Sequence, residues 1–108
     1  MIDFESFKKI YESIPGEHEF ELCFKNTNDT YMIIKYLDDI SFQKCCDKEH
    51  RKEIICSSLD ELYNSILYDD ICLKRDWNNI NDIIIDAAWS AIDDIEEIER
   101  IFNIKKEV

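Results

Sequence analysis

Apolar and polar side chains alternate along residues 18–46, and this alternation constrains the fold more than any other feature. In the stretch HEFELCFK, Phe20, Leu22 and Phe24 recur at every second position. Because successive side chains of a strand point to opposite faces, this period predicts a half-buried strand. Similar segments follow after short polar links, which predicts a four-stranded antiparallel meander. The predicted strands are residues 18–25, 31–37, 40–46 and 52–56.

Helical patterns flank the predicted sheet. Asp3 can cap a helix over residues 4–14, because its carboxylate can accept a free N–H of the first turn, and Pro15 ends that helix. Ser58 and Glu61 are spaced as a capping box at the start of a second helix. Asp69-Asp70 closes this second helix.

The C-terminal part of the sequence predicts a third and longest helix over residues 82–103, capped by Asn81 or Asp82, with isoleucine and alanine forming an apolar stripe. Residues 71–80 fit either a short edge strand or a helical turn, with Trp77 as an anchor. The predicted order is α-β-β-β-β-α-α. We therefore expect a single α+β domain over residues 1–108, with helices packed on one face of the sheet.

The charge balance narrows the classes of partner. The chain has 25 Asp and Glu against 13 Lys and Arg, giving a net charge of −12. Such a charge disfavours polyanions, so we expect neither direct nucleic-acid binding nor membrane binding. No apolar run approaches the ~20 residues that span a bilayer, and the N-terminus lacks a signal-peptide core. We expect a cytoplasmic protein.

The last predicted helix carries acids that its stability does not need. Residues 82–99 include seven acids and no base. Carboxylates near a helix C-terminus face the negative end of its dipole, at up to ~0.3–1 kcal/mol each. One interpretation is that this face only solubilises the chain. The other is that its row of carboxylates imitates a phosphate backbone and forms a docking surface for a basic partner. The partner-binding candidates are Asp82, Asp86, Asp93, Asp94, Glu96, Glu97 and Trp77.

Trp77 and the cysteines have structural interpretations of their own. Trp77 lies in a polar neighbourhood and is either an anchor at the edge of the core or an aromatic contact for a partner. The five cysteines are expected to be reduced, since their number is odd and their spacing forms no framework. Cys45, Cys46 and His50 lie close in sequence, but adjacent strand residues point to opposite faces. We expect no metal site, cofactor or catalytic residue.

These observations favour a non-enzymatic function. The sequence predicts a small acidic inhibitor of a basic, nucleic-acid-handling protein such as a nuclease, comparable to a toxin-immunity protein or an anti-CRISPR protein. The alternative is a structural or regulatory interaction module whose charge only solubilises it. A homodimer is also possible, because an exposed edge strand can pair with a second copy.

Overall fold

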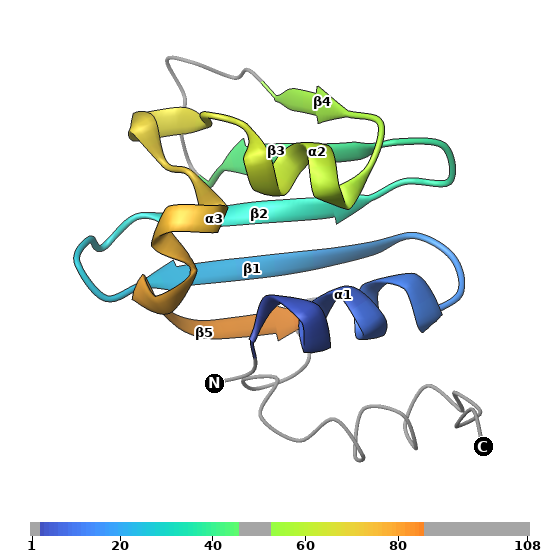
Figure 1. Ribbon diagram of the computed structural model, residues 1–108, viewed down its shortest axis with the longest axis horizontal. Helices are drawn as coiled ribbons and strands as arrows, with labels where there is room; N and C mark the ends of the chain where they lie inside the picture. Colours follow the sequence, from blue (N-terminus) through green and yellow to red (C-terminus); the bar gives the residue numbers. More distant parts are fainter. Residues whose placement is uncertain (1–2, 46–52, 86–108) are drawn as a thin grey trace.

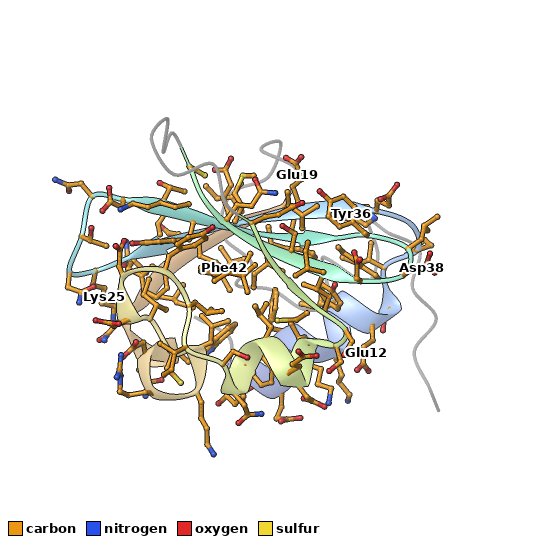
Figure 2. All side chains as sticks on the ribbon, turned by 90° about the horizontal axis from the view of Figure 1, so that it is seen from above. Glu12, Glu19, Lys25, Tyr36, Asp38 and Phe42 are labelled. Atoms are coloured by element: carbon orange, nitrogen blue, oxygen red, sulfur yellow. The ribbon has the colours of Figure 1, made fainter. Side chains whose placement is uncertain are left out.

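The computed structural model describes residues 3–45 and 53–85. Within these residues an antiparallel sheet of order β4-β3-β2-β1-β5 is covered on one face by the helices (Figures 1 and 2). The α+β class, the meander of the first four strands and the one-sided helical layer are confirmed. The elements are α1 Phe4–Ser13, β1 His18–Phe24, β2 Thr30–Lys35, β3 Ile40–Lys44, β4 Ile54–Cys56, α2 Leu59–Asn64, the 3-10 turn η1 Tyr68–Asp70, α3 Leu73–Asp76, the 3-10 turn η2 Trp77–Asn79, and β5 Ile80–Ile85.

The core lies between the sheet and the helices. Phe20, Ile33 and Phe42 are directly opposite one another on β1, β2 and β3, and all three are fully buried. Phe7 of α1 packs edge-on against Phe20, with ring centroids 5.3 Å apart. The alternation that predicts the strands therefore also selects the side chains of the core face.

Helix α1 begins as predicted. The Asp3 carboxylate accepts a hydrogen bond of 2.8 Å from the Ser6 backbone N–H. At the other end, Lys35 Nζ of β2 donates to the carbonyl oxygens of Tyr11 at 2.5 Å and Ile14 at 2.7 Å. These carbonyls belong to the last turn of the helix, which lacks intrahelical partners. A sheet lysine thus ties the end of α1 to β2.

Helix α2 shows half of the predicted capping box. Ser58 Oγ accepts from the Glu61 N–H at 3.1 Å, as expected. The Glu61 carboxylate accepts instead from the backbone N–H of Ser57 at 3.0 Å and from Ser57 Oγ at 2.5 Å. The reciprocal bond therefore starts one residue earlier than the sequence pattern predicts.

Strand β5 corrects the prediction for the C-terminal region. Residues 82–85 are predicted to open a helix, but Ile80–Ile85 pairs antiparallel with β1 and adds a fifth strand. Three successive β-branched residues, Ile83 to Ile85, favour an extended chain, and the edge of β1 offers backbone partners. Of residues 71–80, which are ambiguous in sequence, Leu73–Asp76 forms α3, Trp77–Asn79 forms η2, and Ile80 begins β5. The remainder of the predicted helix lies outside the described residues.

Candidate functional site

Two of the predicted partner-binding residues fall within the described structure. Trp77 is 5% exposed and packs against the rings of Phe4 and Phe7, at centroid distances of 5.2 and 5.3 Å. Of the two interpretations of Trp77, core anchor and partner contact, its burial supports the first. Asp82 lies in β5 rather than at a helix start. The other candidates, Asp86, Asp93, Asp94, Glu96 and Glu97, lie outside the described residues.

Charge is sorted across the two faces of the sheet. By the register, Glu19, Glu21 and Asp82 share the face opposite the helices. The strand lysines Lys35 and Lys44 share the helix-covered face with Phe42 and its neighbours. Among the strand residues that the structure describes, none on the open face is Lys or Arg. Figure 2 shows Glu19 on the side of the sheet away from the helices, and Phe42 between the two layers.

We call this open surface the acidic face. It combines carboxylates with apolar side chains that are half-buried, as Met32 and Ile84 are, or exposed, as Ile55 is, so it offers both charge and apolar area to a partner; Ile34 of the same face is buried. Its residues are Glu19, Glu21, Glu53 and Asp82, with Met32, Ile34, Ile55, Ile84 and Tyr36.

Glu21 lies at the centre of the acidic face in an apolar setting. It is directly opposite Met32 on β2 and Ile84 on β5. The side chains of all three residues are half-buried. Within the described residues, no hydrogen bond or ion pair engages the Glu21 carboxylate. A sheet position between two aliphatic neighbours favours an apolar side chain, so the fold does not explain this glutamate.

Glu53 is held over the same face by two side chains of β3. Its Oε2 accepts from Ser41 Oγ at 2.6 Å and from Gln43 Nε2 at 2.8 Å. Ser41 is fully buried, and Gln43 Nε2 also donates to its hydroxyl at 3.1 Å. These bonds fix the direction of a carboxylate that is itself exposed. Fixed charges recognise a partner at lower entropic cost than mobile ones.

Tyr36 marks one end of the acidic face. It follows Lys35, which points to the helices, so strand alternation turns Tyr36 to the open side, as Figure 2 shows. The pKa of Tyr36 is raised by burial and further by the nearby negative charges of Glu53, Glu17, Asp39 and Glu19. The phenol therefore stands in a negative field.

A second candidate is a polar cleft of about 340 Å³ at the opposite end of the sheet. Lys44 Nζ lies 2.9 Å from Asp69 Oδ2 and 3.5 Å from Asp29 Oδ2, and Tyr31 donates its hydroxyl to Asp69. Bonds from Tyr31 and Lys44 lower the pKa of Asp69. The residues that line the cleft are Phe24, Asn26, Thr27, Asp29, Tyr31, Lys44, Asp69, Ile71, Arg75, Asp76 and Asn79.

Both basic side chains of this cleft, Lys44 and Arg75, are paired with aspartates of the chain. Arg75 donates to both Asp76 oxygens at 2.8 Å and to the Asp70 carbonyl at 2.7 Å. Asp69 and Asp70 have φ of 56° and 59°, a left-handed conformation that aspartate tolerates better than most residues. The hydrogen bonds and ion pairs of the cleft therefore hold the segment after α2 against the sheet.

Residues 3–45 and 53–85 contain neither a metal-binding cluster nor a membrane-spanning helix. This part of the chain contains no cluster of three or more His, Cys, Asp or Glu arranged to hold a metal ion. Cys46 and His50, the sequence candidates for such chemistry, lie outside it. Of the helices between residues 3 and 85, none has the length and apolar character needed to cross a bilayer.

Comparison with known proteins gives no match: no family model fits the sequence, and no curated protein or solved structure matches the chain. Of the carboxylates on the acidic face, Asp82 alone is among the sequence candidates, although the signal of the others is visible in the sequence. Glu19 and Glu21 are at the polar positions of the alternating pattern in the first strand. The lysines of the later strands, in contrast, are at positions in step with the apolar residues.

Proposed function

We propose that this chain is a small acidic binding protein that inhibits a basic, nucleic-acid-handling protein, such as a nuclease, by covering its nucleic-acid site. The observation that carries the proposal is the sorting of charge across the sheet. The acids of the strands lie on the open face, and the lysines lie on the covered one. A surface of one sign steers and holds a partner of the other sign.

The spacing of the carboxylates suits a partner that binds phosphates. Glu19 and Glu21 are two residues apart on one strand, which places their Cα atoms ~6.6 Å apart at the usual strand rise. Alternate phosphates of one strand of a duplex are ~7 Å apart along the helix axis. A rigid sheet therefore presents negative charge at a spacing that a phosphate-binding surface can accept.

The competing function is an interaction module whose charge only solubilises it. A solubilising charge is expected at fully exposed positions, with both signs interspersed. Glu21 departs from this pattern, because it is half-buried between Met32 and Ile84. That position favours the binding function over the solubilising one.

A homodimer through the acidic face is disfavoured by the same charges. A two-fold symmetric pair would bring Glu19, Glu21 and Asp82 of one copy against the same residues of the other. Like charges facing each other are destabilising. Any self-association would therefore use another surface, such as a strand edge.

The biological setting is part of the proposal. Neutralising a toxic nuclease and blocking an anti-phage nuclease are both cytoplasmic tasks that use the same electrostatic occlusion. An immunity protein and an anti-CRISPR protein thus share this mechanism. The chain itself performs no chemistry in either setting.

The test is capture of the partner followed by an activity assay. A face variant, Glu19→Lys with Glu21→Lys and Asp82→Lys, changes the net charge from −12 to −6, because each reversal adds two charges. A control variant, Glu5→Lys with Glu12→Lys and Asp60→Lys, makes the same change on exposed helix positions and gives up one surface ion pair, Lys8–Asp60 at 3.0 Å, of a kind worth at most about 1 kcal/mol. The wild type and the control should capture a basic protein and inhibit its nucleic-acid cleavage at equal stoichiometry. Equal capture and inhibition by the face variant would refute the proposal.

A further inference from the structure

The surroundings of Tyr36 are more specific than those of a general acidic surface. The strand pairs His18–Lys35 and Lys35–Ile40, continued by one residue, bring the backbone positions of Glu17 and Asp39 beside Tyr36. The Tyr36 N–H donates to the Asp39 carbonyl at 3.1 Å, which closes the turn to β3. The charges of Glu17 and Asp39 are also near enough to raise the pKa of Tyr36, so its ring stands among carboxylates at the end of the open face.

Aliphatic side chains adjoin this ring. Ile34 is two residues earlier on the same face of β2, and Ile55 continues the row across Ser41 of β3. Ile55 is 48% exposed and Leu37, in the turn after Tyr36, is 79% exposed. These are two of the three large hydrophobic side chains that are exposed among the described residues.

We propose that the acidic face receives an arginine side chain of the partner, stacked on Tyr36 beside Glu17 and Asp39, with an aliphatic neighbour of that arginine on the exposed Ile55. This inference rests on the proposed function and names the chemistry of the partner segment. The occupant of the acidic face is an amphipathic segment of the partner in which arginine lies beside leucine or isoleucine.

Arginine fits this arrangement better than lysine for three reasons. Its planar guanidinium stacks on an aromatic ring, whereas an ammonium is a compact point charge. Its donors form a fork that can bond a carboxylate through two parallel hydrogen bonds. It is also more weakly hydrated, so it loses less on contact with a partly apolar surface. A polyphosphate or a second acidic chain would meet only repulsion here.

The test uses three synthetic helical peptides of equal length and charge as probes. The first alternates arginine and leucine at helical spacing, the second replaces arginine by lysine, and the third replaces leucine by glutamine. Binding of each to the full chain is measured by fluorescence anisotropy at about 0.05 M salt, where screening is weak. Amide spectra confirm that each variant is folded and locate the contact on β2 and β3.

The arginine–leucine peptide should bind about tenfold more tightly than the lysine–leucine peptide, the effect expected of a partly desolvated cation–π contact. Tyr36→Leu should bring the two peptides within about twofold, whereas Tyr36→Phe, which keeps the ring, should preserve the preference. Glu17→Gln should also reduce it, through loss of one carboxylate of the pair. The arginine–glutamine peptide should bind more weakly than the arginine–leucine peptide.

Equal affinities of the arginine and lysine peptides, or a preference that survives Tyr36→Leu, would overturn the inference. The proposed function would still stand if both peptides lost affinity in the Glu19→Lys, Glu21→Lys variant. If neither peptide responded to reversal of the face charges, the inference and the proposed function would both fail.

Discussion

Replacement of Glu21 by valine should stabilise the fold and weaken binding at the same time. Valine at this position would form cross-strand pairs with Met32 on one side and Ile84 on the other. Each such pair contributes about 0.2–1 kcal/mol, so Glu21→Val should raise the free energy of unfolding by about 0.4–2 kcal/mol. A domain of this size gains ~4–8 °C in melting temperature per kcal/mol, so the midpoint should rise by several degrees.

The assay is urea and thermal unfolding followed by circular dichroism, combined with binding of the arginine–leucine peptide. Thr30→Val is the matched control, since it adds aliphatic surface to the same face without changing the charge. It should bind the peptide as the wild type does. A loss of stability in Glu21→Val would show that Glu21 serves the fold, and the argument that its position indicates function would then be wrong.

Three further perturbations test the structure and the electrostatics. Trp77→Ala should lower the free energy of unfolding by about 3–5 kcal/mol, because it removes a buried indole that packs against Phe4 and Phe7. Thermal unfolding measures this loss. A loss below about 1 kcal/mol would contradict the place of Trp77 in the core. Asp69→Asn should lower stability at neutral pH. Since the folded-state pKa of Asp69 lies below its ordinary value of 3.8, the stabilisation is complete above that value and is lost as the pH falls through the folded-state pKa. Urea midpoints of wild type and Asp69→Asn should therefore converge at low pH, and a gap that persists there would refute the assignment. Partner binding should weaken steeply between about 0.05 and 0.3 M salt, and titration calorimetry at several salt concentrations would measure this; a flat dependence would exclude charge as the main driving force.

The first half of the fold could be predicted because its signals are local. The period of two in residues 18–46 selects the core side chains, and Asp3 lies where a helix cap is required. These features depend on neighbours within a few positions, so the sequence displays them directly.

The fifth strand could not be predicted on the same basis. Residues 80–85 satisfy the first turn of a helical stripe and also an extended strand, and the choice depends on the distant edge of β1. Tertiary pairing overrides a local pattern in such a case. Trp77 illustrates the same limit: its polar sequence neighbours fit either a core anchor or a partner contact, and the packing of Phe4 and Phe7 of α1 against it decides for the core.

The composition of the acidic face depends on whether each charged residue of a strand is at a position that faces the helices or at one that faces away from them. That information is present in the sequence, but it acquires meaning only when the register places Glu19, Glu21 and Asp82 side by side. A sequence-based search for charge finds dense runs, such as the acids of residues 93–99, more readily than residues gathered from separate strands.

The measurement that tests the account most directly is the ratio of two dissociation constants for the captured partner. One belongs to the variant with Glu19, Glu21 and Asp82 reversed, and the other to the variant with Glu5, Glu12 and Asp60 reversed, which has the same net charge. We predict that the first is at least about 100-fold larger, since like charges opposed at an interface cost several kcal/mol. Equal constants would show that net charge alone matters, and the acidic face would not be the binding surface.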